Sequence, residues 1–119
     1  MAAEIVTEYG KITIADDLIA NIAGYAAVEN YGIVGMNPKK ASDTLSDLFG
    51  VGKDNLKRGV VVTLTSPEEM DIDLYVTLEY GVSLPAVAQN AKSNVKYRIE
   101  EMTGLKVNKV NVHVENIRV

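Results

Sequence analysis

The chain has 119 residues, of which 47% are hydrophobic, 24% charged and 6% aromatic, and its net charge is −4. This length and composition predict one folded domain, residues 1–119, and exclude a disordered or fibrous chain. A mildly acidic chain without a basic cluster is poorly suited to bind duplex nucleic acid or an anionic membrane surface. Because the chain has no cysteine, disulfides, thiol catalysis and zinc sites built on thiolates are excluded.

The N-terminal region does not have the pattern of a secretory signal peptide. Glu4 and Glu8 stand where a basic region and an apolar run would be required. The most apolar stretch, residues 18–28, is eleven residues long and contains Asn21, whereas a helix that spans a bilayer needs about 20 residues. We therefore expect a cytoplasmic protein without direct membrane insertion, which reaches a membrane only through another molecule.

The first part of the chain predicts two extended segments, 5–8 and 11–14, followed by a helix. Gly10 separates the two segments, and the Asp16 carboxylate is placed to cap the helix. Apolar residues then recur at three- and four-residue spacing, at Ala15, Leu18, Ile19, Ile22, Ala23, Ala26 and Ala27. Because most of these residues are small, the helix should pack close to its neighbour.

Asn30 and Gly32 predict the end of this helix. Residues 33–34 continue as a short extended segment. The stretch 38–49 has weak helical periodicity and is followed by two glycines, at positions 50 and 52.

The second half begins with a pair of predicted strands. Residues 60–65 are rich in β-branched side chains, and residues 65–70 connect them to the next strand as a hairpin. That strand alternates strictly, with an apolar face made of Ile72, Leu74, Val76, Leu78 and Tyr80. Such alternation predicts one buried face and one face in contact with water.

A second helix is predicted to begin at Pro85 and to end at Gly104. Its apolar stripe consists of Leu84, Val87, Ala88, Ala91, Val95, Ile99 and Met102. Lys96 and Glu100 are spaced to form an ion pair on the exposed side. Residues 107–119 form a last strand, in which the apolar parity changes at residues 115–116 and so predicts a bulge or a bend.

These elements predict an α+β fold. The economical arrangement is a two-layer sandwich, in which two main amphipathic helices cover one face of a small, largely antiparallel sheet.

The sequence contains no arrangement of residues that we interpret as a catalytic, cofactor or metal site. His113, the only histidine, alternates with valines on the polar parity of the last strand, which is typical of a solvated surface residue. Asp71, Asp73 and Glu79 share one strand face, and a row of solvated charges is a more economical interpretation than a cation site. No cofactor is therefore expected, and the partner-binding residues stay undefined.

Other patterns have equally plain interpretations. Residues 50–53, Gly-Val-Gly-Lys, lack the spacing of a phosphate-binding loop. The local excess of lysine and arginine in residues 39–58 is interleaved with aspartates and is typical of a solvated face. Tyr25 and Tyr31 could stack on bases, but tyrosines beside a helix more often pack at half-buried positions.

Several motifs, taken in order, resemble one family. They are Tyr9-Gly10-Lys11-Ile12-Thr13-Ile14, the helix with Ile22-Ala23, Ala26 and Glu29 before Tyr31-Gly32-Ile33, and Lys57-Arg58-Gly59-Val60-Val61-Val62. The most specific are Gly81-Val82-Ser83-Leu84-Pro85-Ala86-Val87-Ala88 and Thr103-Gly104-Leu105-Lys106-Val107, followed by Val110-Asn111-Val112 and Val114. From about residue 5 to residue 117 the chain resembles the alkaline shock protein family, also called the Gls general-stress or envelope stress response family of Gram-positive bacteria.

The resemblance implies a non-enzymatic cytoplasmic protein that serves cell-envelope homeostasis. In such a protein, a membrane-anchored partner holds the chain at the inner face of the membrane, and copies of the chain self-associate as an oligomer. Some members carry long charged extensions, and this chain has almost none, which is the pattern of a shorter housekeeping paralogue. Gly81, Pro85 and Gly104 are interpreted as turn residues at the ends of the second helix, not as a binding site.

Two other classes of function stay open at this point. A single-stranded RNA-binding module is the alternative, because two helices on a small sheet can carry RNA, although the net charge and the absence of a GXXG loop argue against it. A small enzyme or ligand carrier would require a buried pocket lined by polar groups.

Overall fold

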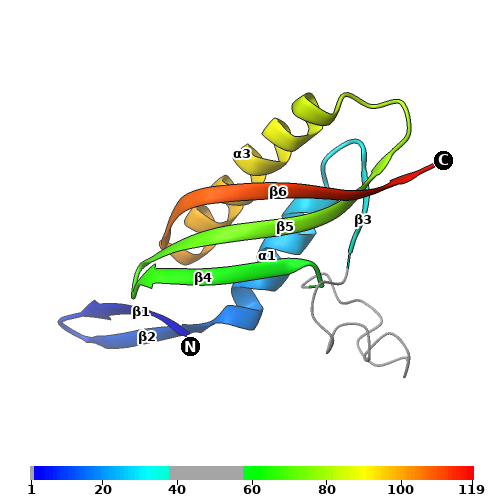
Figure 1. The fold of residues 1–119 in the computed structure, drawn as a ribbon. Helices are drawn as coiled ribbons and strands as arrows, with labels where there is room; N and C mark the ends of the chain where they lie inside the picture. The colour runs from blue at the N-terminus through cyan, green and yellow to red at the C-terminus, as the bar shows by residue number, and fades with distance from the viewer. Residues whose placement is uncertain (1, 38–57) are drawn as a thin grey trace, which may run out of the picture.

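The computed structural model describes residues 2–37 and 58–119 (Figure 1). Its elements, in chain order, are β1 (Ala2–Thr7), β2 (Gly10–Ala15), α1 (Asp16–Val28), β3 (Ile33–Met36), β4 (Val60–Ser66), β5 (Glu69–Glu79), α3 (Leu84–Thr103) and β6 (Lys106–Arg118). The helix predicted at 38–49, the phosphate-loop-like residues 50–53 and most of the basic stretch lie outside the described residues.

Strand β5 organises the main sheet, because it forms hydrogen bonds with three other strands. Along one side it pairs antiparallel with β4 and, further on, with β3. Along its other side it pairs with β6, and this pair is parallel. Helix α3 connects β5 to β6, and a parallel pair requires such a crossover connection. The predicted α+β fold is confirmed, with mostly antiparallel strands and β5–β6 as the parallel exception.

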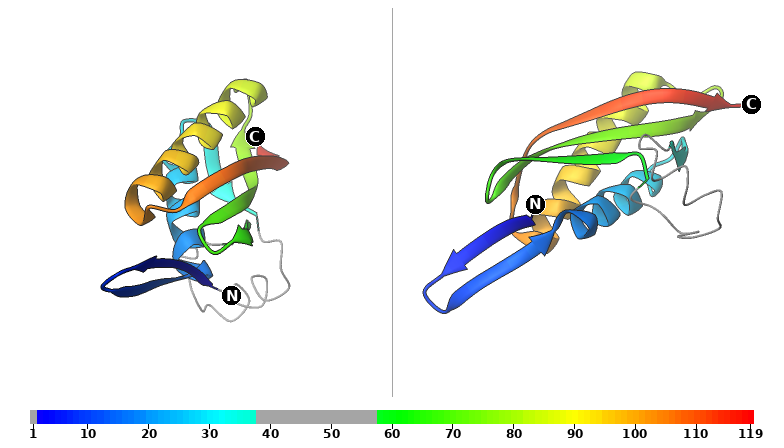
Figure 2. Two further views of the ribbon diagram at one scale, coloured as in Figure 1. Left: turned by 90° about the vertical axis from the view of Figure 1, so that its left-hand side faces the viewer. Right: turned by 60° about the horizontal axis from the view of Figure 1, so that its bottom comes forward.

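Both helices cover the same face of this sheet, as the side view in Figure 2 shows. The face of β5 toward the helices consists of Met70, Ile72, Leu74, Val76 and Leu78, which all have 0% exposure. The strict alternation of the strand explains this burial. Tyr80, which continues the same alternation, is 71% exposed because it lies beyond the end of the strand.

Helix α1 buries its small residues, Ala20, Ala23, Gly24, Ala26 and Ala27, together with Ile19. The predicted close packing is confirmed at Ala26, whose carbonyl oxygen accepts a hydrogen bond of 2.8 Å from the Asn94 side chain of α3. Two predictions for this helix were wrong. Leu18, expected in the apolar stripe, is half exposed. Asp16, expected to cap the helix, is its first helical residue, and Ala15 occupies the N-cap position without a side-chain cap.

Helix α3 is capped at both ends by local interactions. The Ser83 hydroxyl accepts a hydrogen bond from the Ala86 amide, and Gly104 ends the helix in the left-handed conformation. The predicted ion pair between Lys96 and Glu100 is not formed. The Glu100 carboxylate accepts a hydrogen bond of 3.0 Å from the Val107 amide instead, which ties the helix to the start of β6.

Strands β1 and β2 form a separate antiparallel hairpin that extends away from the main body (Figures 1 and 2). Its base is anchored, since Ala3 and Ile14 are buried and the Glu4 amide donates a hydrogen bond of 2.9 Å to the Pro67 carbonyl. Toward the tip, Val6 is 69% exposed and Ile12 is 56% exposed.

The predicted irregularity in the last strand is confirmed. Val114 pairs with Val76 and Asn116 pairs with Thr77, so Glu115 is an extra residue without a counterpart on β5. This bulge explains why the apolar parity changes at this point in the sequence.

Candidate functional site

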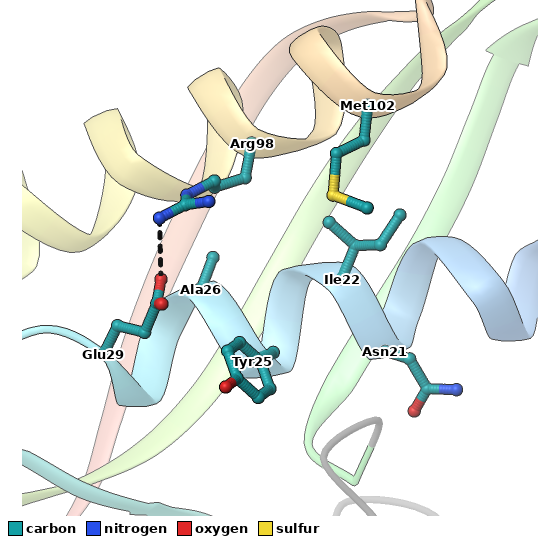
Figure 3. Close-up of a pocket in the computed structure, with 7 residues that line it drawn as sticks. All are labelled: Asn21, Ile22, Tyr25, Ala26, Glu29, Arg98 and Met102. Atoms are coloured by element: carbon teal, nitrogen blue, oxygen red, sulfur yellow. Dashed lines mark ion pairs between the residues drawn. The ribbon is translucent and has the colours of Figure 1, made fainter.

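An open groove lies along the seam between α1 and α3 (Figure 3). It has a volume of about 310 Å³ and is lined by Asn21, Ile22, Tyr25, Ala26, Glu29, Arg98 and Met102. In Figure 3 the strands of the sheet pass behind the two helices, so the groove opens on the side away from the sheet. We call this feature the helix groove.

The floor of the helix groove is apolar. Met102 from α3 and Ile22 from α1 point toward each other, as Figure 3 shows. Met102 is 64% exposed and Tyr25 is 59% exposed, which places two large apolar side chains beside one opening. Met102 is the last residue of the apolar stripe predicted for α3, and Tyr25 is not part of the stripe predicted for α1, so neither side chain is buried against the sheet. A methionine in such a place adapts its shape to different partner side chains.

One end of the helix groove is closed by an ion pair. Nη2 of Arg98 lies 3.5 Å from Oε1 of Glu29 (Figure 3). Both side chains are more than one third exposed, so the pair contributes little to folding stability.

Beyond this ion pair the seam becomes polar. A shallower hollow there is lined by Glu29, Asn30, Asn90, Ser93, Asn94, Tyr97 and Arg98. Two of its side-chain amides form hydrogen bonds within the fold, since Asn30 and Asn94 both donate to the Ala26 carbonyl oxygen. Both hollows are open to solvent.

The opposite face of the sheet carries a cluster around His113. Nε2 of His113 lies 3.0 Å from Oδ1 of Asp73, and the Asn111 side chain donates a hydrogen bond of 3.2 Å to the same oxygen. The His113 ring stacks on Tyr75, with 4.4 Å between the ring centroids and 11° between the planes. The His113 side chain is 41% exposed, as expected of a surface residue, and it contacts two side chains of β5, Asp73 and Tyr75.

Sequence reasoning missed this cluster because it depends on the pairing of two distant strands. The parallel register places Tyr75 opposite His113 and Asp73 opposite Asn111. The cluster stands on a partly exposed strand face, and its contacts join β5 to β6.

The carboxylates of the β5 outer face do not converge on one point. Asp73 interacts with His113, whereas Glu79 pairs with Arg118 at 3.6 Å, near the other end of the strand. Within residues 2–37 and 58–119, no group of three or more histidine, cysteine, aspartate or glutamate side chains is arranged to hold a metal ion. Of the three carboxylates, Glu79 is exposed, whereas Asp71 and Asp73 are half-buried.

The remaining residues singled out in the sequence lie apart. Tyr25 lines the helix groove, whereas Tyr31 is 84% exposed in the turn after α1. Gly81 and Gly104 both have a positive φ, which fits the turn roles expected for them. In the part of the chain that the structure describes, no helix combines the length and apolar character needed to span a bilayer.

Comparison with known proteins identifies the family. The model of the alkaline shock protein (ASP23) family, described by a cell envelope-related function, matches residues 4–119. The chain belongs to the alkaline shock protein family. The family is related to the cell envelope and to stress, as the sequence motifs had indicated.

Relatives from this family cover most of the chain. The uncharacterized protein YloU of Bacillus subtilis (strain 168) is 41% identical over 120 residues, which are 100% of this chain and 98% of YloU. YqhY of the same strain, also uncharacterized, is 35% identical over 94% of this chain and 80% of its own. A stress response regulator gls24 homolog of Streptococcus pyogenes serotype M3 is 29% identical over 92% of this chain and 59% of its own. No solved structure matches this chain.

Proposed function

We propose that this protein is a non-enzymatic interaction module for cell-envelope homeostasis. It is recruited to the inner face of the membrane by a membrane-anchored protein partner, and it self-associates. The observation that carries the proposal is the helix groove, an exposed apolar surface that none of the residues described by the structure fills.

The shape of the helix groove favours an amphipathic helix of the partner as its occupant. A third helix laid along the seam of two helices can place side chains between theirs. Aliphatic side chains of that helix would contact Ile22 and Met102, where the lining is apolar. Polar side chains one or two turns further along would reach Arg98 and the amides of Asn90 and Asn94, where the lining is polar.

The proposal also agrees with the electrostatics of the groove. Arg98 is the cation of the lining and is matched by Glu29, so the surface has no excess positive charge to hold a phosphate backbone. Apolar contact would therefore dominate binding, with the ion pair at the rim fixing the direction of the partner helix.

Photo-crosslinking in native cells tests the proposal. A photoreactive amino acid replaces Met102 in the helix groove or, as a control, Tyr31, which is also strongly exposed but lies outside the groove. We expect position 102, and not position 31, to crosslink to an integral membrane protein that sediments with the membrane fraction. Met102→Glu should release the chain from that fraction, whereas Tyr31→Glu should not.

Two results would contradict the proposal. Equal crosslinking from both positions would show that the groove is not the docking surface. Crosslinking of RNA at position 102, with the protein absent from the membrane fraction, would favour the RNA-binding alternative instead.

A further inference from the structure

Strand β6 forms one border of the main sheet (Figures 1 and 2). It pairs with β5 along nearly its whole length and with no other strand among the described residues. The backbone N–H and C=O groups on the far side of such a strand are available to pair with another extended segment. The strand is 13 residues long, so the available edge is long as well.

The sequence of β6 is close to self-complementary around Val112. When two copies of this strand lie antiparallel with Val112 opposite Val112, Val110 stands opposite Val114. Lys109 then stands opposite Glu115, an opposite-charge pair that occurs twice because of the two-fold symmetry. In the same register Asn111 stands opposite His113, so polar side chains meet polar side chains.

This register also keeps the two faces of the sheet consistent. Val110 is 9% exposed and belongs to the core, and Val112 and Val114 are partly buried against it. Directly opposite residues of an antiparallel pair lie on the same face. The valines of the second copy would therefore extend the inner face, and the helices of both copies would lie on one side of a continuous sheet.

The extent of the pairing is limited by features at both ends. Residues 109–114 pair with residues 71–76 of β5 without interruption, and a register shift bounds this run on each side. Further out, Lys106 would stand opposite Arg118, which is a like-charge pair and opposes longer pairing. The segment that matches a second copy is thus centred on Val112, and the pair of Lys109 with the bulge residue Glu115 lies at its margin.

We propose that two copies of this chain pair through their β6 edges, antiparallel about Val112, and join their main sheets into one. The proposal rests on the self-association stated under the proposed function and assigns it a surface. That surface is separate from the helix groove, so one copy can bind a partner helix and a second copy at the same time.

The absence of cysteine makes a direct test possible, since one introduced thiol is the only thiol of the chain. In the proposed dimer the two copies of residue 112 lie directly opposite, with about 5 Å between their Cα atoms. A short bis-maleimide should therefore crosslink Val112→Cys efficiently into a dimer. Val62→Cys is the matched control, because Val62 is also a partly buried valine but lies on β4, the opposite border of the sheet.

A charge exchange tests the register. Lys109→Glu places a glutamate opposite Glu115 at two symmetry-related positions of the dimer. We therefore expect the dimer Kd from sedimentation velocity to rise about tenfold. The double variant Lys109→Glu/Glu115→Lys restores opposite charges and should recover the original Kd. Thermal unfolding of each variant separates this effect from a loss of folding.

The outcomes decide the proposal. The proposal would be overturned if the chain were monomeric at all concentrations, or if Val62→Cys crosslinked instead of Val112→Cys. It would also be overturned if the double variant remained folded but did not recover association. Membrane recruitment through the helix groove is measured separately at Met102, so loss of the β6 contact leaves that part of the proposed function standing.

Discussion

Nε2 of His113 lies 3.0 Å from Oδ1 of Asp73, across two parallel strands that are joined only through helix α3. The His113 ring also stacks on Tyr75. These contacts bind the outer faces of β5 and β6 together. They are partly exposed to solvent, with side-chain exposures of 41% for His113 and 26% for Asp73, so water weakens the polar contact between the two side chains.

Removing the histidine should therefore have a small but measurable effect. We expect His113→Ala to lower the free energy of unfolding by about 1 kcal/mol, mostly through the lost stacking on Tyr75. His113→Phe is the informative comparison, because it keeps an aromatic ring beside Tyr75 and removes only the contact with Asp73. Denaturant unfolding of both variants measures the two contributions. If His113→Phe were as unstable as His113→Ala, the contact with Asp73 would stabilise the fold more than the stacking does.

Membrane recruitment should be insensitive to this cluster. His113 and Asp73 lie on the strand face, whereas the proposed partner binds the helix groove on the other side of the molecule. We expect His113→Ala and Asp73→Ala to sediment with membranes as the unaltered chain does. Loss of sedimentation in a variant that remains folded by circular dichroism would place a functional site on this face.

Two glycines with nearly the same backbone conformation should respond very differently to alanine. Gly59 has φ 75° and Gly104 has φ 76°, so a side chain is strained at both. A Cβ on Gly59 would also lie 2.3 Å from the Asn37 carbonyl oxygen, whereas a Cβ on Gly104 would lie 3.8 Å from Ile5 Cδ1. Only the first distance is too short for van der Waals contact.

We expect Gly104→Ala to cost about 1 kcal/mol of unfolding free energy, from backbone strain alone. Gly104→Val should cost at least as much because of its branched side chain. Gly59→Ala should cost clearly more than Gly104→Ala, since the Asn37 and Tyr75 carbonyls at this position belong to the backbone and cannot rotate away. Chemical denaturation compares the three variants directly. Equal losses for the two alanine variants would contradict the steric argument.

Tyr97 should titrate later than an ordinary tyrosine. Its hydroxyl donates a hydrogen bond to the Glu101 carboxylate, and this bond, together with the negative charge of Glu101, raises the pKa of the Tyr97 phenol. Because the folded-state pKa is raised, the hydrogen bond stabilises the fold while the phenol is protonated. This contribution is lost as the pH rises through the raised pKa.

Absorbance of the tyrosinate form during alkaline titration measures this effect. The chain has six tyrosines, so Tyr97→Phe identifies which component belongs to Tyr97. We expect Tyr97→Phe to lose a component from the high-pH end of the titration. Glu101→Gln should shift that component to lower pH. If the titration curve of Glu101→Gln were the same as that of the wild type, the Glu101 carboxylate would not hold the phenol proton.

Local patterns predicted much of the fold. The strict alternation of β5 defined its buried face, and Gly104 marked the end of α3, because both depend on residues close in sequence. The parity change in β6 even located the bulge at Glu115. The local patterns were less accurate at element boundaries. Asp16 lies inside the helix it was expected to cap, and Tyr80 lies beyond its strand.

The sequence by itself determined the order of the elements, their buried faces and the family, since each is written in residue type and spacing. Only the tertiary structure decided which distant residues meet. Tyr75 and His113 came together through a parallel pairing, and Ile22 and Met102 through the packing of two helices. Periodicity says which face of an element is buried but not which element covers it. The helix groove exists because α1 and α3 pack on the sheet with their small and aliphatic residues and leave Met102 and Tyr25 exposed. The edge of β6 exists because β6 pairs with β5 and with no other described strand.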